Sequence, residues 1–152
     1  MDVTKIVQEI QYVLSPAVMV SSSALLLLGL QNKFSNLASR FRALNHEKRT
    51  LSQKAGRDER EESRLWNLEE QVDHLMRRAT YVKDAIILAY AGIVCFTGTS
   101  VLIFVNVYAS FHFSRIITGI FLVGLFFVLV SAVLMILETS LFYKIITLER
   151  KS

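Results

Sequence analysis

The chain has 152 residues, of which 53% are hydrophobic, and its formal net charge is +4. The single cysteine, Cys95, excludes an intrachain disulfide and a cysteine-based zinc site. The positive charge is concentrated in one part of the chain, which fits membrane topology better than binding to a nucleic acid, so we expect no nucleic-acid partner.

Three apolar stretches predict an all-α membrane protein, a single membrane domain over residues 1–152. The expected transmembrane helices lie at 16–32, 85–109 and 116–138, near the length of about 20 residues that a helix needs to cross the hydrocarbon core. Three spans bury little surface by themselves. We therefore expect a homo-oligomer in contact with membrane lipid.

The first segment, residues 2–14, places its apolar side chains at helical spacing, with Asp2 as a possible N-cap. This pattern predicts an interfacial helix in the headgroup plane, with a bend at Pro16 before the first span. The alternative is that 2–14 is a short polar start to the first span.

Residues 33–83 predict a long antiparallel helical hairpin between the first two spans. The first span runs into a basic segment without proline or glycine, so one helix should continue as far as the turn near Gly56. Apolar residues at three- and four-residue spacing predict a coiled-coil-like seam between the two arms. The seam residues are Phe34, Leu37, Phe41, Leu44, Leu51, Leu65, Leu68, Val72 and Leu75. Trp66 lies one place off this seam and is either an exposed aromatic or a contact residue.

Two stripes of small or weakly polar residues recur every seven positions in the second and third spans. They are Ala85, Gly92, Thr99 and Asn106 in one span, and Gly124, Ser131 and Glu138 in the other. Such stripes are what close helix packing in lipid requires.

The distribution of lysine and arginine predicts the orientation in the membrane. Twelve of the seventeen lie within 33–83 and three follow Leu137, whereas the N-terminal segment and the 109–115 turn hold one each. The positive-inside rule then places the hairpin and the tail at 139–152 in the cytoplasm, with the N-terminus outside.

The leucine-rich run with its polar end at 25–34 reads LLLLGLQNKF, and the segment at 40–45 reads RFRALN. These two stretches resemble a family of small bacterial membrane proteins that is catalogued only as a domain of unknown function. The Arg77-Arg78-Ala79 run and Glu138 are also similar to the family pattern, whereas Lys33 stands where the family more often has arginine. The resemblance implies three spans in a prokaryotic inner membrane, and it implies no activity.

No catalytic constellation is apparent, so we expect neither an enzyme nor a bound cofactor or metal. The three histidines, His46, His74 and His112, are far apart in the sequence, and no Ser-His-Asp or metal-ligand spacing occurs.

The serine run at 21–23 lies in the middle of the first span. If several first spans surround an axis, one face of this helix would line a pore with hydroxyl groups. That face carries Ser15, Met19, Ser22, Leu26, Leu30 and Lys33. The alternative is that the serines serve helix–helix contact.

Glu138 is an ionisable residue at the edge of a span, which makes it a candidate for function or for an interfacial ion pair. Counting from the centre of each span places Lys33 and Lys83 at a similar depth. We expect Glu138 to point into the bundle and contact Lys33, Lys83 or another basic residue of this rim, such as Arg78 or Arg40.

These patterns favour a homo-oligomeric membrane protein that conducts small cations, with the first span nearest the axis. The alternative is a non-conducting structural or regulatory subunit whose hairpin docks a cytoplasmic protein.

Overall fold

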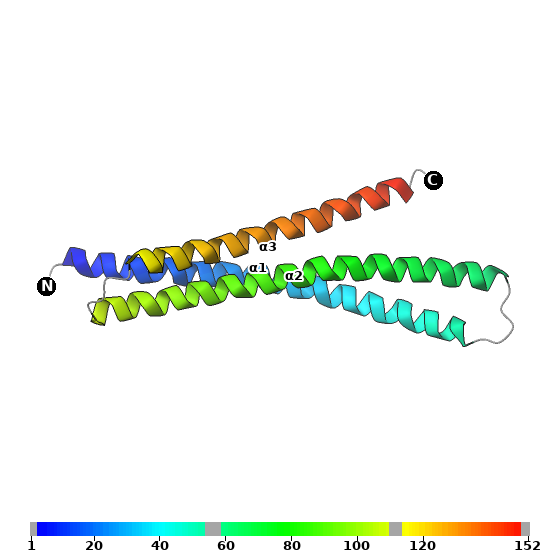
Figure 1. The fold of residues 1–152 in the computed structure, drawn as a ribbon, viewed down its shortest axis with the longest axis horizontal. Coiled ribbons are helices and arrows are strands. Elements are labelled where there is room, and N and C mark those ends of the chain that lie inside the picture. The colour runs from blue at the N-terminus through cyan, green and yellow to red at the C-terminus, as the bar shows by residue number, and fades with distance from the viewer. Residues whose placement is uncertain (1–2, 54–58, 110–113, 150–152) are drawn as a thin grey trace.

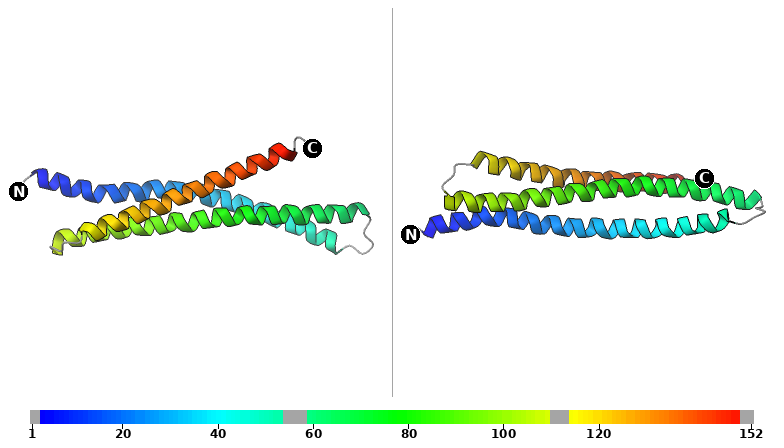
Figure 2. Two further views of the ribbon diagram at one scale, coloured as in Figure 1. Left: turned by 45° about the horizontal axis from the view of Figure 1, so that its top comes forward. Right: turned by 60° about the horizontal axis from the view of Figure 1, so that its bottom comes forward.

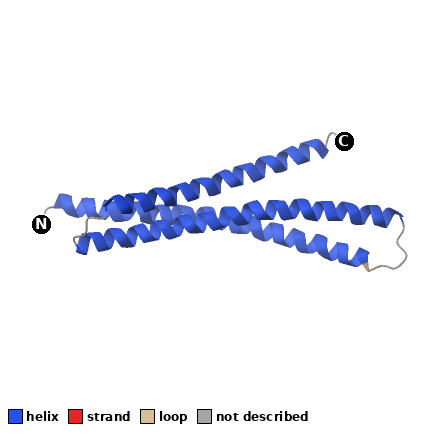
Figure 3. Cartoon of the chain, in the orientation of Figure 1, coloured by secondary structure: helices blue, strands red, loops and turns tan. Residues whose placement is uncertain are grey.

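The structure, a computed structural model, consists of three long helices. They are α1 (Val3–Ser52), α2 (Glu59–Ala109) and α3 (Ser114–Glu149). Residues 3–53, 59–109 and 114–149 are described, and these residues include no strand (Figure 3). The all-α fold is as predicted. Asp2 and Gly56, expected as a helix cap and a turn, lie outside the described residues, as does the end of the expected tail.

Each helix is long and apolar enough to cross a membrane. The candidate spans lie within Leu14–Ser52, Glu59–Asn106 and Ser114–Ser140, so the chain is a membrane-spanning protein with three such helices. At 1.5 Å per residue, α1 and α2 are each about 75 Å long, whereas the hydrocarbon core is about 30 Å thick. More than half of α1 and more than half of α2 therefore exceed the thickness of the hydrocarbon core.

The first helix is continuous from Val3 to Ser52, and Pro16 lies inside it. The segments expected separately at 2–14 and 16–32 therefore belong to one helix, which also includes the first arm of the expected hairpin. Pro16 is buried. A proline removes only one backbone donor, and packing against other helices can hold the helix together at that point.

The three helices lie side by side, with α2 in the middle (Figure 2, right). The chain reverses direction after α1 and again after α2, so that α2 runs antiparallel to both neighbours (Figure 1). Beyond the end that α3 reaches, α1 and α2 continue as a pair. The central helix α2 therefore shares an extensive interface with each neighbour, whereas α1 and α3 contact each other only sparsely.

The interface between α1 and α2 follows the predicted seam. Leu37, Leu68 and Leu75 are buried, and one cluster joins Leu37 and Leu75 to Val82, with Phe41 packed against it. Of the other seam residues, Leu44, Leu51, Leu65 and Val72 are half-buried. Phe34 is 38% exposed at the edge. A second cluster continues the same interface into the spans.

The interface between α2 and α3 brings the two small-residue stripes together. Ser131 is fully buried and its hydroxyl donates a hydrogen bond of 2.7 Å to the carbonyl oxygen of Ala85. A Cβ atom built on Gly92 would lie 3.1 Å from the carbonyl oxygen of Gly124. The backbones are therefore close at this crossing, and a side chain larger than that of glycine would require its neighbours to shift.

Replacing Gly92 with alanine should destabilise the α2–α3 packing. The new Cβ would lie 2.6 Å from Cγ2 of Val128 as well as close to the Gly124 carbonyl, so the helices must separate at a cost of about 1–3 kcal/mol. Gly98→Ala is the matched control, because its Cβ meets nothing within 4 Å and alanine favours a helix over glycine. Thermal unfolding in detergent should show a lower midpoint for Gly92→Ala alone. Equal midpoints for both variants would contradict the close crossing.

Candidate functional site

A buried carboxylate joins the three helices at one level. The Glu138 side chain of α3 is 1% exposed. Its Oε1 accepts a hydrogen bond of 2.8 Å from Nε of Arg78 on α2, and its Oε2 pairs with Nζ of Lys33 on α1. Lys33 also donates to the Thr139 hydroxyl at 3.3 Å. The three charged side chains form what we call the inner-rim cluster.

The sequence pattern brings each member of this cluster to the same place. Glu138 follows Gly124 and Ser131 at seven-residue intervals, so it continues the face of α3 that packs on α2. Lys33 lies three residues after the buried Leu30, and Arg78 lies three after the buried Leu75. The expected contact between Glu138 and a basic rim residue therefore involves Lys33 and Arg78 together.

The other basic residues considered for this contact lie elsewhere. Lys83 is beside Asp84, with Nζ 3.3 Å from the carboxylate, and its side chain is mostly exposed. Five residues beyond Arg78, it is turned about 140° around α2, which directs it away from α3. Arg40 is exposed on α1. Lys83 was a candidate because it lies at a depth similar to that of Glu138. Its direction around α2 excludes a contact with the carboxylate.

The inner-rim cluster satisfies the requirements for a buried charge. A carboxylate removed from water is strongly disfavoured unless opposite charges and hydrogen bonds surround it. Here each oxygen has its own cation, and no buried side-chain nitrogen or oxygen in the described part of the chain lacks a hydrogen-bond partner. Lys33 and Arg78 keep partial exposure, with side chains 30% and 22% accessible. The cluster is thus a fixed cross-link between helices, with a net charge of +1.

The residues considered as a pore lining do not share one open face of α1. Ser15 and Ser22 point outward, whereas Met19 and Leu26 are half-buried. Leu30 is 2% exposed and packs in a cluster with Ala85 and Ala89 of α2, and Lys33 is engaged by Glu138. The expectation that Leu30 faces an axis is thus wrong for a single chain, because α2 covers it.

The serine of the first span that is buried was not identified from the sequence. Ser23, not Ser22, is buried in the span. The signal in the sequence is a seven-residue register that runs through Pro16, Ser23, Leu30 and Leu37, all of which are buried. This register extends the hairpin seam into the first span.

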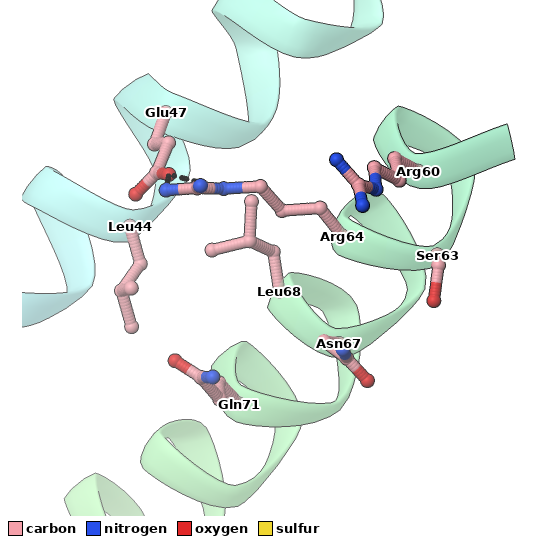
Figure 4. Close-up of a pocket in the computed structure, with 8 residues that line it drawn as sticks. All are labelled: Leu44, Glu47, Arg60, Ser63, Arg64, Asn67, Leu68 and Gln71. Atoms are coloured by element: carbon pink, nitrogen blue, oxygen red, sulfur yellow. Dashed lines mark hydrogen bonds and ion pairs between the residues drawn. The ribbon is translucent and has the colours of Figure 1, made fainter. Parts of the chain in front are cut away.

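The outer part of the hairpin contains a polar hollow of about 420 Å³ between its arms (Figure 4). Arg64 reaches across it and donates to Glu47, with Nη2 2.6 Å from Oε1. Leu44 and Leu68 are the apolar residues of its lining, and Arg60 also lines it. In the described residues no group of three or more histidine, cysteine, aspartate or glutamate side chains is placed to hold a metal.

Removing the charge of Glu138 should destabilise the three-helix assembly. In Glu138→Gln, Lys33 and Arg78 remain at the rim without a counter-charge, which we expect to lower the free energy of unfolding by about 3 kcal/mol. Asp73→Asn is the control, since Asp73 pairs with Arg77 on an exposed face and should change stability by less than about 0.5 kcal/mol. Denaturant unfolding in micelles measures both. Similar small effects would show that the inner-rim cluster does not hold the helices.

Comparison with known proteins gives one family match. The family model described as "Protein of unknown function (DUF2721)" matches residues 13–148. This match includes all three spans, the hairpin and every member of the inner-rim cluster, and it confirms the resemblance found in the sequence. No curated protein and no solved structure matches the chain.

Proposed function

We propose that this chain, which belongs to the DUF2721 family, is a non-conducting structural or regulatory protein of the bacterial inner membrane. Its helical hairpin lies in the cytoplasm and docks another protein there. The inner-rim cluster marks the cytoplasmic end of the spans and fixes the third span to the base of the hairpin.

The proposed orientation is supported by the positive residues. Most lysine and arginine residues of the chain lie in the hairpin, between the first two spans. Positive segments of this kind are retained on the cytoplasmic side. The inner-rim cluster supports the same orientation, because its excess positive charge lies at the junction between the spans and the hairpin.

Cysteine labelling tests the orientation. In a Cys95→Ala background, cysteines at Thr4 and Ser114 should react with an impermeant reagent in intact cells, because these positions lie at the end of the bundle away from the hairpin. A cysteine at the exposed His46 should react only after the cells are permeabilised. Labelling of the His46 position in intact cells would refute the cytoplasmic hairpin.

The hairpin has the length and rigidity of a docking arm. From Lys33 to Ser52, α1 continues for about 28 Å past the inner-rim cluster, well beyond the headgroup layer. Two pairs tie its arms together, Lys48 with Glu69 at 2.8 Å and Arg64 with Glu47 at 2.6 Å. With the apolar seam between them, the arms form one stiff projection.

Trp66 is the observation that carries the proposal. Its side chain is 65% exposed on the outward face of α2, although burying an indole in a contact is strongly favourable. Exposed carboxylates of Glu62, Glu69 and Glu70 surround its position on the helix. Tryptophan is enriched among the residues that dominate binding energy at protein interfaces. The chemistry of this face suits a partner with a basic rim and an apolar recess.

Cation conduction by an oligomer is the second candidate. The outward-facing hydroxyls of Ser15 and Ser22 favour it, because they could line an axis between several chains. The Ser22 hydroxyl donates to the carbonyl oxygen of Val18 at 2.9 Å, which leaves its oxygen available as an acceptor. Against this candidate, the burial of Leu30 and the pairing of Lys33 remove two members of that lining.

Photo-crosslinking tests docking at Trp66. A photoreactive residue at position 66 should give one specific adduct in cells. The same residue at Asn67, about 100° around the helix, should not. With the captured partner purified, Trp66→Ala should weaken binding about thirtyfold, as loss of a dominant interface residue does. Equal labelling at both positions, or cation flux through the purified protein in liposomes, would contradict the proposal.

A further inference from the structure

The hairpin carries an apolar groove on the face turned away from α3. It is lined by Phe34, Ala38 and Phe41 of α1 and by Met76 and Ala79 of α2, with a volume of about 160 Å³. Met76 is 50% exposed. It lies two residues, or about 200°, around α2 from Arg78, which contacts Glu138 of α3. No polar side chain lines this groove, which begins at the level of the inner-rim cluster, next to Lys33 and Arg78.

Opposite charges border the groove on its two sides. Arg42 and Arg49 are exposed on α1, seven residues apart, and Arg42 follows Ala38 by one turn. Glu62 and Glu69 are exposed on α2, and with Met76 they form a stripe of seven-residue intervals. Within the described chain, Arg42, Arg49 and Glu62 make no ion pair, and Glu69 uses one oxygen for Lys48. The face thus has a basic edge, an apolar centre and an acidic edge.

The two edges are in register along the hairpin. Lys33 and Arg78 meet at Glu138, and Glu47 meets Arg64. Because the arms are antiparallel, moving one residue later in α1 matches moving one residue earlier in α2. This register places Arg42 level with Glu69, and Arg49 level with Glu62.

The membrane fixes how a second copy can meet this face. All copies of the chain cross the bilayer in the same sense, so a two-fold axis between them must run along the membrane normal. Rotation about that axis brings α1 of one hairpin opposite α2 of the other without a change of level. Each arginine edge then faces the glutamate edge of the other copy, and the two apolar centres meet.

We propose that this face of the hairpin binds the same face of a second copy, forming a two-fold symmetric four-helix bundle. Arg42 and Arg49 of each copy pair with Glu69 and Glu62 of the other, and Phe34 and Met76 close the grooves. The apolar centre supplies most of the binding energy and the charged edges fix the register. Trp66 lies about 40° further around α2 than Glu62, so the dimer and a partner bound at Trp66 share the acidic edge formed by Glu62 and Glu69.

Charge reversal tests the bundle with protein in lipid nanodiscs and in detergent, where mass measurement gives the number of chains. Wild type should be dimeric. Arg49→Glu and Glu62→Arg each place like charges together and should raise the dimer dissociation constant at least about tenfold. When the two variants are mixed, both charge contacts have opposite signs again, so mixed dimers should form with near wild-type affinity.

Arg40→Glu is the matched control, because Arg40 is exposed and lies about 200° around α1 from Arg42. It should leave the dimer unchanged. A monomeric wild type, an equal loss in Arg40→Glu, or failure of the two reversed variants to form mixed dimers would each overturn the proposal. A groove occupied only by phospholipid in a monomer would do the same. These measurements use the purified chain alone, so their outcome does not depend on whether a partner docks at Trp66.

Discussion

The rest of the structure depends on one buried carboxylate. Glu138 has no contact with bulk water, and its two oxygens are held by Lys33 and Arg78 from two other helices. A charge in this position is tolerated only while both cations are present. The positions of the three helices along the bundle and their rotations are therefore fixed together, because a shift of any one of them would separate a charged pair.

On both sides of the inner-rim cluster, side chains at the same heptad positions are buried, but different interactions hold the helices together. On α1 the stripe through Ser23, Leu30 and Leu37 is buried both within the span and beyond it. In the hairpin, for which we propose a cytoplasmic location, apolar packing provides the contact, because the hydrophobic effect acts in water. In lipid that force is absent, and close approach at Gly92 and the hydrogen bond from Ser131 replace it. Because the helices are unbroken, the type of interaction changes along each helix while the helix direction stays the same.

Much of this arrangement could be predicted from the sequence, because long periodic helices leave few alternatives. The three apolar helices, the arm-to-arm seam and the facing stripes on α2 and α3 all follow from spacing. Depth counting also placed Glu138 among basic side chains. Rotation was harder to predict: three consecutive serines offer hydroxyls over most of the helix circumference, so the sequence alone did not distinguish Ser23 from Ser22. Likewise, depth along the helix alone did not distinguish Arg78 from Lys83, because these residues differ mainly in their direction around α2.

The continuity of α1 from Val3 to Ser52 also makes the protein a lever. Transmembrane helices adjust to bilayer thickness by tilting, and here no joint separates the tilting part from the projecting part. With an arm of about 28 Å beyond the inner rim, a 10° change of tilt moves its tip sideways by about 5 Å. A change in lipid thickness that tilts the spans would therefore displace the far end of the hairpin.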